Sequence, residues 1–262
     1  MSTSADFRDK WALVTGASSG IGTALARELA ARGAKLILTA RRRERLEALA
    51  AELAAKGTET RIVAADLNDP AAPQQIYDST EGAGFAVDIL VNNAGLGQYG
   101  AFSHAPVDQE IGQIRVNCEA MVHLTRFFVP RMVNRRRGWI LVVASTAGFQ
   151  PIPYLSTYAA TKVFDRFFAL GLAEEVDRFN VKVTALCPGP TESEFFEVAR
   201  AGVFRKRRVQ PAEDVARQAI SALARGQRTI IPNLTGQAGA FFVRFFPVGL
   251  ITRVIEAASR PK

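Results

Sequence analysis

The chain has 262 residues, of which 48% are hydrophobic and 22% charged, and its formal net charge is +8. This length allows one large α/β domain or two small ones, with a hydrophobic core large enough to fold without disulfides or structural metals. The basic charge falls in short arginine-rich runs without aromatic interleaving, which favours a small anionic ligand over nucleic acid.

Apolar runs rich in β-branched residues alternate with helical patterns along the whole chain. The patterns predict strands over 11–15, 35–39, 61–64, 89–92, 139–144, 181–186 and 228–231. They predict helices over 20–32, 43–56, 107–134, 157–178 and 211–225. We therefore expect an α/β fold: a single Rossmann-fold domain over 1–262, with a seven-stranded parallel sheet flanked by helices. The core would span about 10–231, a substrate loop about 190–210 and an apolar C-terminal tail about 232–262.

Cysteine usage and apolar segments suggest a cellular compartment. Cys118 and Cys187 show neither Cys-x-x-Cys spacing nor a metal-ligand pattern, so we expect no disulfide and no metal site. No apolar leader precedes the first strand, and no stretch reaches the roughly 18 uninterrupted apolar residues of a membrane span. A cytoplasmic protein is the expectation.

A glycine-rich turn joins the first predicted strand to the first predicted helix. Glycine allows a tight turn and close approach of backbone N–H groups to a phosphate at a helix N-terminus. Because strand, loop and helix follow in the right order, the turn predicts a dinucleotide site. The candidate residues are Gly16, Ser18, Ser19, Gly20, Ile21 and Gly22.

The end of the second strand bears on the choice of cofactor. NAD-binding proteins usually place an acidic residue there to bind the ribose diol. This chain has Arg41 and Arg42 instead, and arginine suits a phosphate group. We therefore expect NADP(H) to be preferred over NAD(H). Asp66, followed by Leu67, could accept from the adenine amino group or cap a nearby helix.

Tyr158 and Lys162 are four residues apart in a predicted helix, and Ser145 precedes Tyr158 by thirteen residues. Positions i and i+4 share a helix face, so the ammonium can lie beside the phenol. A neighbouring positive charge favours the phenolate and is expected to lower the pKa of Tyr158. Proton transfer to a carbonyl oxygen benefits from such a shift.

With these residues in place, the chain resembles the short-chain dehydrogenase/reductase family from about residue 10 to 231. The glycine turn matches the family's Thr-Gly-x-x-x-Gly-x-Gly motif, and Tyr158-x-x-x-Lys162 matches its active site. Further matches follow in the family order, at Asn92-Asn93-Ala94-Gly95, Asn117, Ser145 and Pro188-Gly189-Pro190-Thr191.

The resemblance implies a role for each matching residue. Tyr158 would be the general acid in carbonyl reduction, Lys162 would hold the nicotinamide ribose, and Ser145 would bind the substrate oxygen. Asn117 would bind a water that links Lys162 to solvent. The cofactor would also contact Asp66, Leu67, Asn93, Ala94, Gly95, Pro188, Gly189 and Thr191. The family commonly forms homodimers or homotetramers through its long helices, so we expect such an assembly here.

The last thirty residues depart from many bacterial 3-oxoacyl-carrier-protein reductases of the family, which end in a Gly-Gly after the last strand. The tail resembles the bacterial DltE-like branch of general short-chain dehydrogenases, and also microsomal hydroxysteroid and long-chain 3-oxoacyl reductases. It is apolar, and Pro247 would interrupt any helix. Three interpretations remain open: packing over the substrate cleft, a subunit contact, or a peripheral membrane contact, which is the least favoured.

Aromatic side chains in the substrate loop indicate the class of substrate. Phe195, Phe196, Val198 and Phe204 favour an apolar or acyl-bearing carbonyl, although they could merely seat the loop. The basic run over 205–208 could meet a coenzyme A or carrier-protein phosphate. The predicted function is reversible NADPH-dependent reduction of a carbonyl to an alcohol. The alternatives are a dedicated 3-oxoacyl thioester reductase and a non-catalytic NADP(H)-binding sensor.

Overall fold

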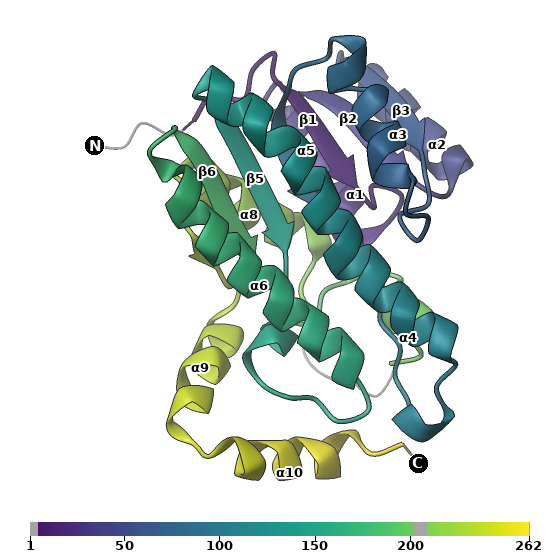
Figure 1. Cartoon of the computed structure of the whole chain (residues 1–262), viewed down its shortest axis with the longest axis vertical. Coiled ribbons are helices and arrows are strands. Elements are labelled where there is room, and N and C mark those ends of the chain that lie inside the picture. Colours follow the sequence, from purple (N-terminus) through teal and green to yellow (C-terminus); the bar gives the residue numbers. More distant parts are fainter. Residues whose placement is uncertain (1–4, 202–208, 262) are drawn as a thin grey trace.

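A parallel β-sheet forms the centre of the computed structural model, which describes residues 5–201 and 209–261 (Figure 1). Within these residues seven strands pair in the order β3-β2-β1-β4-β5-β6-β7, and every pair is parallel. The strands are β1 (Trp11–Thr15), β2 (Lys35–Ala40), β3 (Thr60–Ala64), β4 (Val87–Asn92), β5 (Gly138–Val143), β6 (Val181–Leu186) and β7 (Thr229–Ile230). The predicted Rossmann-type sheet is confirmed.

Helices cover both faces of the sheet because the strand side chains alternate in direction and both sets are apolar. Ala12 and Val14 of β1 belong to one buried cluster, with α1 (Gly20–Ala31), α2 (Arg43–Ala54) and α8 (Ala212–Ala224). Leu13 belongs to the cluster on the opposite face, with α3 (Ala72–Asp78), α5 (Ala120–Arg135) and α6 (Ser156–Asp177). Figure 1 shows α5 and α6 running side by side across this second face.

The helical stretch predicted over 107–134 contains an irregularity at the residue singled out by the sequence. It consists of α4 (Val107–Ile114), a π-helical turn over Arg115–Glu119 and α5. Such π-turns are frequent at functional sites because they redirect one side chain without ending the helix. Asn117 lies in this turn and is 2% exposed.

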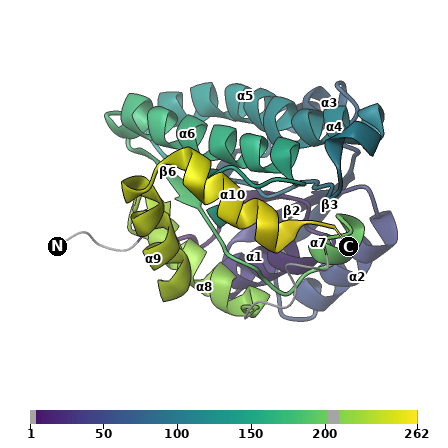
Figure 2. The ribbon, with the colours of Figure 1, turned by 90° about the horizontal axis from the view of Figure 1, so that it is seen from below.

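The C-terminal tail forms two helices that the sequence analysis did not assign. They are α9 (Leu234–Phe242) and α10 (Val248–Ser259), and Pro247 directly precedes α10, where proline is tolerated. Both lie at the end of the molecule toward which the strands point, and α10 crosses that end (Figures 1 and 2). In the described part of the chain no helix is long and apolar enough to span a membrane.

Short 3-10 turns complete the fold. They are η1 (Glu81–Ala83), η2 (Phe102–His104), η4 (Thr146–Phe149) and η6 (Val243–Phe245). The part of the substrate loop that the structure describes contains one short helix, α7 (Phe195–Val198). Phe204 and the basic run over 205–208 lie outside the described residues.

Candidate active site

A cavity of about 400 Å³ opens at the carboxyl ends of the strands. It lies where the strand order reverses between β1 and β4, the place at which parallel sheets bind ligands. Every residue predicted to contact the cofactor lines this cavity, and so do Ser145, Tyr158 and Lys162. Asn117 is the exception, because it lines a much smaller cavity behind the wall.

The glycine loop has the shape that a bound phosphate requires. Gly16 has a φ of +65°, and a Cβ added there would lie 2.8 Å from Nδ2 of Asn93. A Cβ at Gly22 would lie 2.2 Å from the carbonyl oxygen of Gly16. Ser19 precedes α1 without capping it through its side chain, so the N-terminal N–H groups of α1 are not capped from this residue. This cradle fits the diphosphate of a dinucleotide.

Thr15 and Asn93 hold the glycine loop against β4. The Thr15 Oγ1 accepts hydrogen bonds from the backbone N–H groups of Asn93 at 2.9 Å and Ala94 at 3.0 Å. The Asn93 Nδ2 donates to the Thr15 carbonyl at 2.8 Å. The Asn92 side chain instead donates to the hydroxyl of Thr125 on α5, at 2.9 Å. Asn93 therefore braces the loop from within the cavity wall.

The end of the cavity beside β2 is basic. Arg42 donates to the Ser18 hydroxyl at 3.2 Å and forms an ion pair with Glu194 at 2.8 Å. Arg45 pairs with the same carboxylate, and these two hydrogen-bonded arginines hold the pKa of Glu194 below its usual value. Arg41 also lines the cavity. The roles of Glu194 and Arg45 were missed from the sequence, because nothing in it places the substrate loop on α2.

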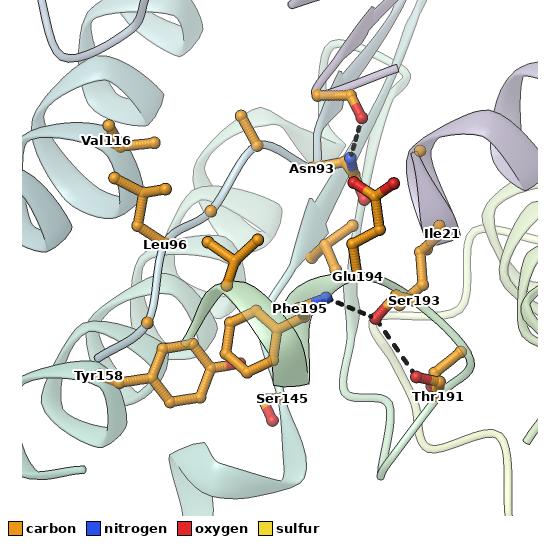
Figure 3. Close-up of a pocket in the computed structure, with 18 of the residues that line it drawn as sticks. Ile21, Asn93, Leu96, Val116, Ser145, Tyr158, Thr191, Ser193, Glu194 and Phe195 are labelled. Atoms are coloured by element: carbon orange, nitrogen blue, oxygen red, sulfur yellow. Dashed lines mark hydrogen bonds between the residues drawn. The ribbon is translucent and has the colours of Figure 1, made fainter. Parts of the chain in front are cut away.

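Ser145, Tyr158 and Lys162 converge at the floor of the cavity. Ser145 follows β5, and its hydroxyl accepts a hydrogen bond from the Ala147 N–H at 3.1 Å. Tyr158 and Lys162 lie one turn apart on α6, with the Lys162 Nζ 5.8 Å from the centre of the Tyr158 ring. Figure 3 shows Tyr158 with Ser145 close by. A carbonyl oxygen placed between the two hydroxyls would meet two hydrogen-bond donors.

The expectation of a lowered Tyr158 pKa is wrong. Burial raises the pKa of Tyr158 and outweighs the opposing effects of the Lys162 charge and the hydrogen bond with Ser145, while the Asp165 carboxylate raises it further. The Tyr-x-x-x-Lys motif reveals the lysine but neither the desolvation of Tyr158 nor the nearby carboxylate. At neutral pH the phenol is therefore protonated and ready to act as an acid.

Lys162 is 4% exposed and has two partners inside the protein. Its ammonium donates to the Val143 carbonyl and to the Asp165 Oδ2, both at 2.9 Å. Asp165 lies three residues further along α6 and is 2% exposed. The sequence analysis overlooked it, although i, i+3 spacing from Lys162 was the available signal.

Asn117 fastens the π-turn to the cavity wall. Its Oδ1 accepts from the Leu96 N–H at 2.8 Å, and its Nδ2 donates to the Leu96 carbonyl and to the Thr161 hydroxyl, both at 2.9 Å. Both N–H groups of the Asn117 amide therefore donate hydrogen bonds within the protein. Asn117 thus holds the segment after β4 in place through the backbone of Leu96. The water-binding role that the family resemblance implies for Asn117 stays a prediction.

The outer half of the cavity is walled by apolar side chains. Figure 3 shows Phe195 beside Tyr158, and the centres of the two rings are 5.0 Å apart. Phe195 also lies against Gly97, where an added Cβ would come within 2.5 Å of its ring. The other walls come from Leu96, Ile152, Leu155, Phe196, Val198 and Ile255.

Helix α10 contributes Ile255 to this wall and is held in place by two tyrosines. The Tyr99 hydroxyl donates to the Ser259 carbonyl at 2.6 Å, and the Tyr154 hydroxyl donates to Glu256 at 2.7 Å. Of the three interpretations of the tail, the structure thus shows packing over the cleft for the inner face of α10.

The comparisons with known proteins agree with this geometry. The family model for short chain dehydrogenases matches residues 10–203. The chain belongs to the short-chain dehydrogenase family. The family predicted from the sequence motifs is therefore confirmed, whereas the narrower DltE-like branch stays a prediction.

Several relatives act on long acyl chains according to their names. The chain is 38% identical over 186 residues to a very-long-chain 3-oxoacyl-CoA reductase of Danio rerio. The aligned residues cover 68% of this chain and 58% of that protein. The chain thus spans about three fifths of the length of that reductase. It is 31% identical to mouse dehydrogenase/reductase SDR family member 7B, over 97% of this chain and 82% of the other.

Solved structures show the same fold with both kinds of cofactor. A short-chain dehydrogenase from Sphingobium yanoikuyae in complex with NADPH has a TM-score of 0.81 and 33% identity, over 92% of this chain and 95% of that one. A family member from Burkholderia phymatum in complex with NAD has a TM-score of 0.85 and 25% identity, over 95% and 97%.

Proposed function

We propose that this protein reduces a carbonyl group to an alcohol with NADPH, and catalyses the reverse oxidation when the alcohol is in excess. The observation that carries the proposal is the convergence of Ser145, Tyr158 and Lys162 beside a glycine cradle in one cavity. A bound nicotinamide would supply the hydride. The residues of the chain would position the carbonyl and provide the proton.

Each side chain has a task that follows from its surroundings. The Ser145 and Tyr158 hydroxyls would orient the carbonyl oxygen, and Tyr158 would donate its proton to that oxygen as negative charge develops. Burial raises the pKa of Tyr158, so the phenol holds its proton until the oxygen becomes basic. The nearby Lys162 ammonium would stabilise the resulting phenolate.

The preference for NADPH rests on the basic end of the cavity. Arg42 reaches toward Ser18 across the groove, and Arg41 and Arg45 lie beside it. Guanidinium groups bind a phosphate through charge-assisted hydrogen bonds, whereas a ribose diol offers no anion to pair with them. The related structures contain NADPH, NADP or NAD, so the choice has to be made on these arginines.

An acyl-bearing or otherwise apolar carbonyl compound is the substrate class that the cavity favours. Its outer walls are aliphatic and aromatic, with Phe195 over Tyr158 and Ile255 from the tail. Names of relatives such as very-long-chain 3-oxoacyl-CoA reductase support a 3-oxoacyl thioester as one candidate. A non-catalytic NADP(H) sensor is disfavoured, because a binder would have no need for the converging hydroxyls.

A homodimer or homotetramer is the proposed assembly. Phe164 and Phe167 of α6 and Ile111 and Ile114 of α4 are exposed, and α4 packs beside α6. Apolar side chains gathered on long helices suit a subunit contact. Size-exclusion chromatography with light scattering would test this, and a monomer at micromolar concentration would contradict it. The cytoplasmic location stays a prediction.

A carbonyl panel tests the reaction class. Purified protein would be given NADPH or NADH with 3-oxoacyl thioesters, steroids, aldehydes and small diketones, and loss of the reduced cofactor would be followed. Turnover with NADPH that falls roughly a hundredfold or more in Tyr158→Phe is the expected result. Full turnover in Tyr158→Phe would remove Tyr158 from its role, and NADPH binding without any turnover would favour the sensor.

A further inference from the structure

A buried carboxylate lies behind the candidate active site. The Asp165 Oδ2 is 2.9 Å from the Lys162 Nζ, and the two side chains are 3% and 6% exposed. An ion taken out of water costs several kcal/mol unless it is paired and hydrogen-bonded. The buried Asp165 carboxylate in α6 therefore requires a compensating positive charge, and the Lys162 ammonium supplies it.

The second oxygen of Asp165 is also placed unusually. Among the described residues, no donor reaches the Asp165 Oδ1 or the Asn92 Oδ1, and both atoms are buried. Asn92, Asp165 and Asn117 line a common cavity of about 10 Å³. A cavity of roughly 10–15 Å³ admits one water, which could donate one proton to each oxygen. Asp165 thus lines this small, mainly apolar cavity as well as pairing with Lys162.

We propose that Asp165 is a positioning residue, the buried counter-ion that holds the Lys162 ammonium in place and sets the pH at which the Tyr158–Lys162 pair gives up a proton. The inference rests on the proposed roles of Tyr158 and Lys162. It adds to them a residue that touches neither substrate nor cofactor, since Asp165 lies behind the main cavity and does not line it.

The charges around Asp165 give the direction of its effect. The titratable groups that face it are Lys162 and Tyr158 on α6, Cys118 in the π-turn and Cys187 after β6. Burial lowers the pKa of Lys162, but the Asp165 carboxylate and Tyr158 more than offset this and keep the ammonium charged. The same carboxylate raises the pKa of Tyr158. With Asp165 present, the buried Tyr158–Lys162–Asp165 group has no net charge while Tyr158 is protonated.

Asp165→Asn removes one negative charge and leaves a buried net positive charge. The Tyr158–Lys162 pair should then release its proton at lower pH, because the Tyr158 phenolate takes the place of the lost carboxylate as the counter-ion of the buried ammonium. A nearby like charge raises the pKa of an acidic group, so removal of the Asp165 carboxylate should lower the pKa of Tyr158. We expect the tyrosinate absorbance of Tyr158 to move to lower pH by at least about one unit.

The titration needs no substrate. Tyrosinate absorbance would be followed against pH in the intact protein, and the same titration in a Tyr158→Phe background would be subtracted to isolate Tyr158. Asp177→Asn is the matched control, because Asp177 ends the same helix and pairs with Lys182 at an exposed position. The control should leave the Tyr158 titration unchanged. A titration in folded Asp165→Asn that coincides with the wild type would overturn the proposal.

A stability cycle covers the case in which Asp165→Asn folds poorly. The melting temperature would be measured for Lys162→Met, for Asp165→Asn and for the double variant. Lys162→Met alone leaves a buried unpaired carboxylate, so it should be the least stable, and adding Asp165→Asn should raise its melting temperature. Additive losses would show that the two residues are not a counter-ion pair.

These readouts separate the two proposals. A protein that turns over no carbonyl but shows the shifted titration and the coupled melting temperatures refutes the proposed reaction and keeps the role of Asp165. Turnover that depends on Tyr158, with an unshifted titration and additive melting temperatures, supports the reaction and refutes the role of Asp165. If the protein is active, the pH profile of alcohol oxidation should shift to lower pH in Asp165→Asn.

Discussion

Glu194 of the substrate loop forms ion pairs with arginines that we propose to bind the cofactor phosphate. Its carboxylate pairs with Arg42 and Arg45 at the basic end of the cavity, next to Ser18. The added phosphate of NADPH would compete with this carboxylate for the same guanidinium groups, whereas NADH would not. Glu194→Gln should therefore strengthen the binding of NADPH and leave that of NADH nearly unchanged.

The exposure of these side chains fixes the size of the effect. Glu194 is 37% exposed, and its arginine partners are 39% and 48% exposed, so solvent screens both pairs. Exposed ion pairs contribute about 0.2–1 kcal/mol each, so their combined loss is worth about 1 kcal/mol. Because about 1.4 kcal/mol corresponds to a tenfold change, the Kd for NADPH should fall by about three- to tenfold.

Isothermal titration calorimetry of both cofactors would measure the effect without any substrate. Glu192→Gln is the matched control, because Glu192 is an exposed acid on the same loop two residues earlier. It should leave the ratio of the two Kd values as in the wild type. Unchanged or weaker NADPH binding in Glu194→Gln would refute the competition between carboxylate and phosphate.

Three further predictions follow from individual contacts. Gly97→Ala should displace Phe195 from the Tyr158 ring and raise the substrate KM about two- to tenfold, which corresponds to the loss of one aromatic contact. Calorimetry should show an unchanged affinity for NADPH. An unchanged KM would contradict the role of Phe195 in covering the substrate. Glu52 pairs with Arg27, which lowers its pKa from 4.5 to about 2, so the pair stabilises the fold above pH 4.5 and this contribution is lost as the pH falls toward 2. Chemical denaturation should thus show Glu52→Gln about 0.5–1 kcal/mol less stable than wild type at neutral pH and nearly equal to it only below pH 2, and a constant difference would be inconsistent with the pair. Burial raises the pKa of Cys118 to about 12, so a thiol reagent near neutral pH should label it only after denaturation, and rapid labelling of the native protein at Cys118 would show otherwise.

The sequence predicted the sheet and most of the site because both rest on local patterns. Buried parallel strands appear as continuous apolar runs, and glycines mark the dinucleotide turn, so their positions needed no tertiary information. Helix α3 was missed because Pro73 near its start resembles a loop, although proline is tolerated in a first turn. Helix α9 was missed because apolar residues lie on all its sides, and α10 because Pro247 was expected to interrupt any helix, whereas it directly precedes α10.

What the sequence could not supply are contacts between distant segments and the cost of burial. Glu194 meets Arg42 across 152 positions, and Tyr99 reaches Ser259 across 160. The direction of the Tyr158 pKa shift was wrong because desolvation depends on packing that no motif reports. Asp165 resembles an ordinary acid on a helix surface until the structure shows that its face of α6 is buried.

Hydride transfer requires the chain to bring a carbonyl, a proton donor and a nicotinamide cofactor together. The most direct measurement uses NADPH that carries deuterium on the transferable ring carbon, with the best substrate of the carbonyl panel, and mass spectrometry of the product. We expect an alcohol with one deuterium on the former carbonyl carbon, formed by the wild type and roughly a hundredfold more slowly or less by Tyr158→Phe. An alcohol without the label from either deuterated form of NADPH, or no alcohol from any carbonyl tested, would contradict it.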